Sequence, residues 1–361
     1  MAASRFHELT VAAIDRQTAD SVVLAFDVPD ALRSAFAFRP GQYLTLAAQI
    51  DGEELRRSYS ICSAPGETAL RVGVKKMADG RFSGFVNEKL EVGQRLRVMP
   101  PEGRFTASRI GGRHDYLLIA AGSGITPMLS IASTVLGHEP ESTVSLVYGN
   151  RQTASIMFRE ELEDLKDRHL GRFALVHVLS REKQDVELLT GRIDGVRIAA
   201  MAGRGLIDPL GADGVFLCGP GEMIDDVAAA LAVLGVAEDK IRFERFTPAG
   251  EVAPRRPPSE AARQAVADGV AVEVVLDGVR RAFPMGESAA SVLDAAHEAG
   301  LELPYSCAGG MCCTCRCRVV EGTAEMAVNY SLQPWEIEAG FTLACQSRPT
   351  SKRLVLDFDA A

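Results

Sequence analysis

The first part of the chain, up to about Phe105, alternates apolar and polar residues over short stretches. The runs are LTVAAI, SVVLAF, QYLTLAA and ALRVGVKK, and turn-forming residues separate them. Alternation with a period of two is typical of half-buried β-strands, and several such strands in a row favour a small barrel. The pattern therefore predicts an antiparallel β-barrel domain over residues 1–108.

From Tyr116 onward, buried strands alternate with helices. YLLIAAGSGITPMLSIASTVL is typical of a strand, a glycine-rich turn and a helix, the first unit of a parallel sheet. Further strands are VSLVYG, FALVHVLS and GVFLCG, and the helical segments include FREELEDLKDR. We expect an α/β domain with a doubly wound parallel sheet over residues 109–247, which binds ligands at the carboxyl ends of its strands. Gly122, Gly124 and Pro127 interrupt the longest apolar run, so we predict no membrane segment.

A change of composition follows this domain. PAGEVAPRRPPSEAARQ is rich in Pro, Ala and Arg and has no apolar period, so it predicts a linker over residues 248–268. VAVEVVLDG and VRRAFPMG then predict a β-hairpin, and SVLDAAHEAG predicts a helix. These elements indicate a small α+β domain over residues 269–361.

Four cysteines of this last domain have the spacing of an iron–sulfur site. Cys307, Cys312 and Cys315 follow the order C-x4-C-x2-C, and Cys345 follows after a long interval. Three thiolates on one tight loop and a fourth from a distant segment hold a plant-type [2Fe–2S] cluster. The small residues between them let backbone N–H groups turn toward sulfur. Zinc or disulfides are the weaker interpretation, because no second short Cys or Cys/His pair is present.

The other cysteines and the net charge limit the kinds of protein that this chain can be. Cys313 and Cys317 are surplus to the four ligands, and we interpret them as small thiols packed beside the cluster. Thiolates that must stay reduced indicate a reducing compartment, so we expect a cytoplasmic protein. The formal net charge of −9 gives no electrostatic basis for a nucleic-acid role.

Chemistry suited to a flavin lies within the predicted barrel. Arg57-Ser58-Tyr59-Ser60 offers a guanidinium that can clamp a pyrophosphate, a ring that can stack on the isoalloxazine, and a hydroxyl that can reach the flavin N5 edge. Alone, this motif is also compatible with a strand that exposes one arginine. Gly80 to Ser83 leads into a helical stretch, whose N-terminus would offer backbone N–H groups to the same pyrophosphate. Two phosphate-holding segments in one barrel predict FAD.

The second domain carries features of a dinucleotide site. The segment Gly122–Pro127, GSGITP, ends the first strand, and its two glycines let the backbone approach a dinucleotide. Cys218-Gly219-Pro220 ends a later strand in the same way; Cys218 is either a buried small residue or a wall of the nicotinamide pocket. Arg151 follows the second strand and no acid appears before Glu160, which favours NADPH, with NADH as the alternative.

Taken together, these motifs resemble the ferredoxin-NADP reductase type of flavoprotein with a plant-type ferredoxin domain at its C-terminus. The resemblance covers essentially the whole chain and implies a β-grasp fold for the last domain. Segments such as GRIDG and NYSLQPWEIEAGFTLACQS are similar to the reductases that serve the di-iron phenylacetyl-CoA epoxidase of aerobic phenylacetate degradation. The reductases of the Rieske-type 3-ketosteroid 9α-hydroxylase are similar in layout and stay the alternative.

The resemblance implies roles for individual residues. Those expected to bind FAD are Arg57, Ser58, Tyr59, Ser60, Lys75, Gly80, Phe82 and Ser83. Those expected to bind the nicotinamide dinucleotide are Gly122, Gly124, Thr126, Pro127, Arg151, Cys218, Gly219 and Pro220. Those expected beside the reacting rings are Ser60, Cys218, Glu244 and Phe246. The iron ligands are expected to be Cys307, Cys312, Cys315 and Cys345.

These cofactors together predict an electron-transfer enzyme. A nicotinamide gives up two electrons as hydride, a [2Fe–2S] cluster accepts one at a time, and a flavin can do both. None of the six His has a Glu three residues before it, so this chain lacks the Glu-x-x-His pairs of a di-iron site. The expected partner is therefore a separate oxygenase. A non-catalytic flavin and iron–sulfur protein is the alternative from another class.

Overall fold

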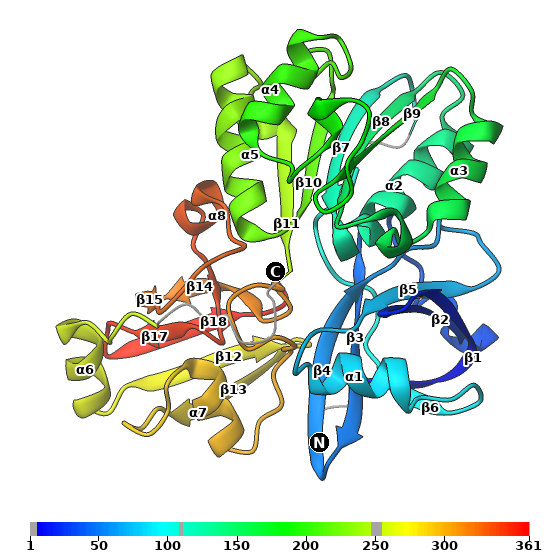
Figure 1. Cartoon of the computed structure of the whole chain (residues 1–361). Helices are drawn as coiled ribbons and strands as arrows, with labels where there is room; N and C mark the ends of the chain where they lie inside the picture. The colour runs from blue at the N-terminus through cyan, green and yellow to red at the C-terminus, as the bar shows by residue number, and fades with distance from the viewer. Residues whose placement is uncertain (1–5, 108–110, 247–254, 361) are drawn as a thin grey trace. The chain divides into compact units, whose positions relative to one another are not determined.

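A computed structural model describes residues 6–107, 111–246 and 255–360 (Figure 1). The chain divides into two compact units, one within Phe6–Ala249 and one within Gly250–Ala361. Each unit has hydrophobic cores of its own. The first unit holds two sheets of different kinds, and the second holds a mixed sheet.

An antiparallel six-stranded sheet opens the first unit, in the order β4-β3-β6-β1-β2-β5. Its strands are β1 (His7–Thr18), β2 (Ser21–Asp27), β3 (Tyr43–Ile50), β4 (Glu53–Ser60), β5 (Leu70–Lys75) and β6 (Arg95–Val98). A bridge between Ile61 and Val72 joins the end of β4 to β5, so the two edge strands meet. Alternate residues such as Leu44 and Leu46 point into the core, as the period-two pattern predicts. The predicted antiparallel barrel domain is confirmed.

Helix α1 packs against this sheet. α1 (Arg81–Glu88) buries Phe82 and Val86 in the core of the barrel. A short 3-10 turn, η1 (Asp30–Leu32), lies between β2 and β3. Because Gly80 is the N-cap residue of α1, the N-terminus of this helix lies where the sequence places a phosphate-binding segment.

A parallel five-stranded sheet follows in the order β11-β10-β7-β8-β9. Its strands are β7 (Asp115–Ala121), β8 (Thr143–Asn150), β9 (Phe173–Leu179), β10 (Gly214–Gly219) and β11 (Ile241–Arg245). The helices are α2 (Ile125–His138), α3 (Arg159–Arg168), α4 (Gly195–Gly203) and α5 (Gly221–Leu234), with 3-10 turns η2 (Gly122–Gly124), η3 (Thr153–Ser155), η4 (Glu187–Leu189) and η5 (Glu238–Lys240). Leu118 packs with residues of α2 and α3, whereas its neighbour Leu117 packs with residues of α4 and α5. Helices therefore cover both faces of the sheet, and the predicted doubly wound domain is confirmed (Figure 1).

The second unit contains a five-stranded mixed sheet in the order β13-β12-β18-β14-β16 and a two-stranded sheet of β15 and β17. The strands are β12 (Ala271–Leu276), β13 (Val279–Pro284), β14 (Arg316–Glu321), β15 (Ala324–Met326), β16 (Phe341–Leu343), β17 (Ser347–Pro349) and β18 (Arg353–Asp357). The helices are α6 (Glu260–Ala267), α7 (Val292–Glu298) and α8 (Pro334–Glu338). The predicted hairpin is β12 and β13, and the predicted helix is α7.

Part of the predicted linker over residues 248–268 is folded. Residues 248–254 lie outside the described residues, but helix α6 occupies Glu260–Ala267. The Ser259 hydroxyl accepts a hydrogen bond of 3.1 Å from the Ala262 N–H and so caps this helix. Ala262 and Ala265 are buried. The apolar pattern missed the helix because its buried face consists of alanines, which give a weak periodic signal.

Among the described residues, no helix is both long enough and apolar enough to cross a membrane.

Candidate functional site

The two barrel motifs lie side by side. Tyr59 of β4 and Phe82 of α1 have ring centroids 5.8 Å apart, so the strand that ends at Ser60 runs next to the start of α1. Arg57 is exposed, and its guanidinium donates a hydrogen bond of 2.7 Å to the backbone oxygen of Arg56. An exposed guanidinium on the strand that runs beside a helix N-terminus is a donor set that suits a pyrophosphate. The residues present therefore fit FAD.

The turn before α1 is shaped by one hydroxyl. Ser83 Oγ accepts a hydrogen bond of 3.0 Å from the Met77 N–H and donates one of 3.2 Å to the Gly80 oxygen. A Cβ atom at Gly80 would lie 2.5 Å from Ser83 Oγ, so only glycine fits against this hydroxyl. The Ser83 side chain thus organises the turn. The backbone at the start of α1 is the part that suits a phosphate.

Two further residues predicted to bind FAD contact other protein groups. Ser58 Oγ lies 3.4 Å from Thr45 Oγ1 on the neighbouring strand. Lys75 of β5 forms an ion pair of 3.0 Å with Asp20. Burial opposes ionisation of Asp20, but its hydrogen bonds from Thr18 and Lys75 prevail and lower its pKa, with help from the nearby charge of Arg151. Lys75 therefore belongs to a charged group beside Arg151, and its contact with FAD stays a prediction.

The glycine turn after β7 is held tightly against β10. Gly122 has a φ of +55°, and no atom lies within 4 Å of a Cβ placed there. At Gly124, in contrast, a Cβ atom would lie 2.1 Å from the Cys218 oxygen. The Tyr148 hydroxyl donates a hydrogen bond of 2.9 Å to the Gly122 oxygen. The turn therefore presents backbone to open space on one side and packs against β10 on the other, which suits close approach of a dinucleotide.

Thr126 and Pro127 are buried in the first turn of α2. The Thr126 hydroxyl donates a hydrogen bond of 3.0 Å to the Ser123 oxygen and so stabilises the glycine turn. Gly122 and Ser123 are only partly buried, whereas Thr126 and Pro127 are covered. A ligand at this turn would therefore meet the backbone of the first two residues before it met either buried side chain.

A hydrogen bond joins the barrel to the parallel sheet at this edge. Ser60 Oγ, at the end of β4, donates a hydrogen bond of 2.9 Å to Glu244 Oε2 on β11. Glu244 pairs in register with Cys218 of β10, which is fully buried. Burial raises the pKa of Glu244 to about 7, although the hydrogen bond from Ser60 opposes the shift. Burial also raises the pKa of the Cys218 thiol, and the nearby charge of Glu244 adds to the effect. The structure thus brings together three of the residues predicted beside the reacting rings.

Other predicted residues lie around the same edge. Phe246, just after β11, packs against the core formed by α2 and its sheet. Pro220 is the N-cap residue of α5 and follows Gly219 directly. Arg151 is exposed at the end of β8, and its backbone oxygen accepts a hydrogen bond of 2.7 Å from the N–H of Arg181, which is also exposed. Arg181 was not predicted from the sequence. Its position just after β9, at the carboxyl edge of the sheet, is the feature that could have indicated it.

Backbone N–H groups converge on the first pair of predicted iron ligands. Cys307 Sγ accepts hydrogen bonds from the N–H groups of Gly309 at 3.3 Å and Cys312 at 3.4 Å. Cys312 Sγ accepts one of 3.4 Å from the Cys307 N–H. A hydrogen bond from the Cys312 thiol, with help from these N–H groups, lowers the pKa of Cys307 to about 5 despite burial. The hydrogen bond with Cys307 and burial raise the pKa of Cys312, so the loop favours thiolate at Cys307, which is the form that binds iron.

The second pair of predicted ligands comes from separate segments. The thiols of Cys315 and Cys345 are hydrogen-bonded to each other, and both residues are buried. Gln346 Nε2 donates a hydrogen bond of 3.5 Å to Cys345 Sγ and one of 3.0 Å to the oxygen of Ala308 in the cluster loop. Within the described residues, no three His, Cys, Asp or Glu side chains converge on the position of a single ion. The four sulfurs instead form two pairs, a donor set that fits two irons.

The surplus cysteines point to other groups. Cys313 Sγ lies 2.9 Å from Ser331 Oγ, and its own backbone has a φ of +60°. Cys317 Sγ is fully buried and lies 3.9 Å from the Thr342 oxygen. Both contacts suit the interpretation of these residues as packed thiols beside the cluster loop.

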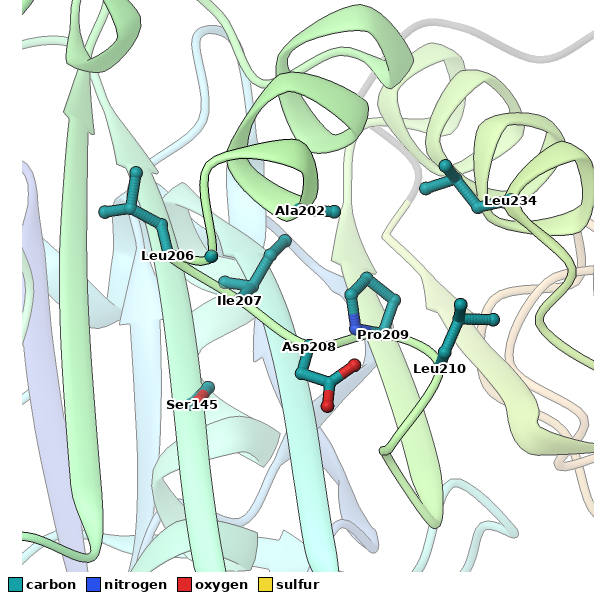
Figure 2. A pocket seen from close by; sticks show the side chains of 9 residues that line it. Ser145, Ala202, Leu206, Ile207, Asp208, Pro209, Leu210 and Leu234 are labelled. Carbon is teal, nitrogen blue, oxygen red and sulfur yellow. The ribbon is translucent and has the colours of Figure 1, made fainter.

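A cavity of about 500 Å³ opens at the opposite edge of the parallel sheet. Its lining includes Ser145, near the start of β8, and the segment from Gly205 to Leu210, which precedes β10 (Figure 2). None of the predicted site residues lines it. Because parallel sheets bind ligands at the carboxyl ends of their strands, this cavity is not the dinucleotide site.

The barrel, the parallel sheet and the thiol loop thus define an electron-transfer flavoprotein with a nicotinamide site and an iron–sulfur domain. Family models match the three parts in turn: an oxidoreductase FAD-binding domain over residues 8–107, an oxidoreductase NAD-binding domain over residues 118–229, and a 2Fe-2S iron-sulfur cluster binding domain over residues 274–350. FAD, a nicotinamide nucleotide and a [2Fe–2S] cluster are therefore its cofactors.

Known proteins extend this result over the whole chain. One component of the 1,2-phenylacetyl-CoA epoxidase of Escherichia coli is 46% identical, with 98% of each chain covered. The ferredoxin reductase component of the 3-ketosteroid-9-alpha-monooxygenase of Rhodococcus rhodochrous is 37% identical over 98% of this chain and 97% of its own. The solved structure of phthalate dioxygenase reductase has a TM-score of 0.59 at 22% identity, with 98% of each chain covered, and so shares the fold. This chain belongs to the flavin and iron–sulfur reductases of multicomponent oxygenases, which pass electrons from a nicotinamide nucleotide through FAD to a [2Fe–2S] cluster.

Proposed function

We propose that this reductase supplies the di-iron oxygenase of a phenylacetyl-CoA epoxidase, with NADPH as its preferred electron donor. The observation that carries the choice of oxygenase is the similarity to the epoxidase component, at 46% identity over nearly the full length of both chains, against 37% for the steroid monooxygenase component. The remaining steps of the proposal concern the residues of this chain.

Hydride transfer is the first step that the site supports. FAD, when bound, supplies the chemistry that accepts two electrons together and releases them one at a time. In our assignment, Arg57 and the start of α1 hold its pyrophosphate, and Tyr59 lies against the ring system. The Ser60–Glu244 hydrogen bond of 2.9 Å holds the flavin side of the barrel to the dinucleotide side of the sheet. This contact orients the two binding edges toward each other.

The dinucleotide is assigned to the carboxyl edge of the parallel sheet. The turn Gly122–Gly124 would meet its pyrophosphate with backbone groups, and Cys218 would form a wall beside the nicotinamide. Arg151 and Arg181 support the choice of NADPH, because two exposed guanidinium groups at neighbouring strand ends suit a 2′-phosphate. NADH is the alternative donor.

The cluster is assigned to the two thiol pairs of the second unit. Cys307 and Cys312 would bind one iron, and Cys315 and Cys345 the other, because the thiols are paired in this way. Backbone N–H groups of the loop would stabilise the charge on sulfur. Four ligating thiolates support a cytoplasmic location.

Reconstitution tests the proposal. The protein, NADPH and the oxygenase components of a phenylacetyl-CoA epoxidase are combined, and consumption of phenylacetyl-CoA is measured with and without this chain. We expect consumption only in the complete mixture. Turnover with a Rieske-type steroid hydroxylase but not with the epoxidase would favour the second candidate function, that of a steroid hydroxylase reductase. The 37% identity to the steroid monooxygenase component supports this candidate. Absence of NADPH- or NADH-driven ferricyanide reduction would instead indicate a non-catalytic protein.

A further inference from the structure

Gly73 leaves a gap in strand β5 of the barrel, and side chains of the parallel-sheet domain fill it. A Cβ atom at Gly73 would lie 2.6 Å from Thr126 Cγ2, 3.1 Å from Phe158 Cζ and 3.2 Å from Met157 Cε. Gly73 is not among the residues with positive φ. The glycine is therefore required here for its missing side chain and not for its backbone freedom.

Thr126 has little room to move when a Cβ atom is added at Gly73. It lies in the first turn of α2, directly after the turn Gly122–Gly124, and is 1% exposed. On the other side of this segment, a Cβ atom at Gly124 would lie only 2.1 Å from the Cys218 oxygen. The start of α2 is thus held between β5 and β10 with no room for a methyl group on either side. Because protein interiors are close-packed, pressure on one side must displace the other.

The residues opposite Gly73 are held by the barrel itself. Phe158 has a φ of +57° and a ψ of 29°, a left-handed conformation that is uncommon for a bulky residue. Its N–H donates a hydrogen bond of 3.0 Å to Gln17 Oε1 on β1, and its side chain is buried. Arg71, two residues before Gly73, binds both carboxylate oxygens of Glu161 in α3 at 3.3 and 2.8 Å. The two domains are therefore tied together on both sides of the gap.

We propose that Gly73 is a positioning residue for hydride transfer. Its missing side chain sets how closely the barrel, which carries the flavin, approaches the turn Gly122–Gly124, which presents the nicotinamide; this rests on the proposed assignment of that turn. An added methyl group must move Thr126 Cγ2 from 2.6 Å to a carbon–carbon contact of about 3.5 Å. A displacement of about 1 Å between reacting groups costs on the order of 100-fold in rate. Gly73 thereby acts through Thr126.

Gly73→Ala tests this, with Gly137→Ala as the matched control. Gly137 lies on the exposed side of α2, and no atom lies within 4 Å of a Cβ placed there. Flavin reduction by NADPH is followed anaerobically in a stopped-flow instrument after the FAD content of each variant has been measured. We expect reduction to be at least about 10-fold slower in Gly73→Ala and unchanged in Gly137→Ala. The primary isotope effect with 4-deuterated NADPH should rise in Gly73→Ala alone.

A compensating change separates contact from general damage. Thr126→Ser removes Cγ2 but keeps the hydroxyl that bonds Ser123. The double variant Gly73→Ala/Thr126→Ser should therefore reduce its flavin nearly as fast as Thr126→Ser alone, and it carries the test if Gly73→Ala alone is recovered without FAD. The melting temperature of the full chain is the second readout: Gly73→Ala should lower it less in the Thr126→Ser background.

The outcomes are distinct. Normal flavin reduction in Gly73→Ala would overturn the inference, and so would a double variant much slower than Thr126→Ser alone or an equal loss in Gly137→Ala. If wild-type protein is not reduced by NADPH or NADH, the proposed function fails and the inference fails with it. Normal wild-type reduction together with a normal Gly73→Ala leaves the proposed function standing and removes only the positioning role.

Discussion

Replacing Glu244 by glutamine tests the carboxyl group that joins the barrel to the parallel sheet. Glu244 lies near the end of β11 and accepts a hydrogen bond of 2.9 Å from Ser60 Oγ. Glutamine keeps the size of the side chain and one acceptor oxygen, but it cannot ionise. Glu244→Gln therefore separates the effect of charge from the effect of shape.

The expected effect follows from the raised pKa of Glu244. Burial moves this pKa from 4.5 to about 7. Between these values the folded protein holds a proton that the unfolded chain has lost, so stability falls as the pH rises through this range and the loss is complete above about pH 7. At 1.36 kcal/mol per pKa unit the shift corresponds to about 3 kcal/mol. Because the side chain is partly exposed, screening reduces the expected loss to about 1–2 kcal/mol.

The assay compares unfolding at two pH values. Urea-induced release of the flavin, followed by its fluorescence, is measured at about pH 5.5 and about pH 8, on either side of the Glu244 transition. Wild-type protein should lose about 1–2 kcal/mol more stability over this interval than Glu244→Gln. Glu238→Gln, which alters an exposed acid of η5, should behave as wild type. An identical pH dependence in wild type and Glu244→Gln would refute the reasoning.

Three further changes test the other sites. Arg151→Ala should lower the preference for NADPH over NADH, measured as the ratio of the two kcat/KM values, by about 10-fold, since one charge-assisted hydrogen bond is lost; an unchanged ratio would remove Arg151 from the site. Cys345→Ser should abolish acid-labile sulfide and cytochrome c reduction while flavin-dependent ferricyanide reduction continues, whereas Cys313→Ser should keep the cluster; a cluster retained in Cys345→Ser would contradict the ligand set. Glu336→Ala should destabilise the cluster domain by about 3–5 kcal/mol, because it removes the carboxylate that forms a 2.9 Å ion pair with the buried Arg316. Loss of cluster absorbance in urea measures this, and Glu338→Ala, on the exposed side of α8, should have little effect.

Local patterns were sufficient for most of the fold. The period-two runs predicted the barrel strands, and the strand, glycine turn and helix from Tyr116 onward correspond to β7, η2 and α2. These predictions succeeded because apolar periodicity is a property of neighbouring residues. The linker prediction partly failed at α6, where alanines are buried and large apolar residues are few. The pattern could not distinguish a small buried face from an irregular segment.

The candidate site likewise has some features that the sequence predicts and others that it does not. The cysteine spacing and the two glycine-rich turns could be interpreted from the sequence, because each motif places its groups within a few residues of one another. The role of Ser83 could not be foreseen: its hydroxyl shapes the turn before α1 through Met77 and Gly80. Thr126 likewise supports the glycine turn from a buried position. In both cases the residue type suits a ligand and a turn equally well, and only the tertiary structure distinguishes the two roles.

By itself, the sequence determined which chemistry this protein contains: four thiols in the order of an iron–sulfur loop, a flavin motif on a barrel strand, and a glycine turn after a buried strand. Only the tertiary structure decided how these parts meet. The Ser60–Glu244 hydrogen bond joins residues 184 positions apart, and the gap at Gly73 receives Thr126 and Phe158 from the other domain. The physical reason is that periodicity and spacing describe neighbours along the chain, whereas contacts between distant segments depend on how whole domains pack.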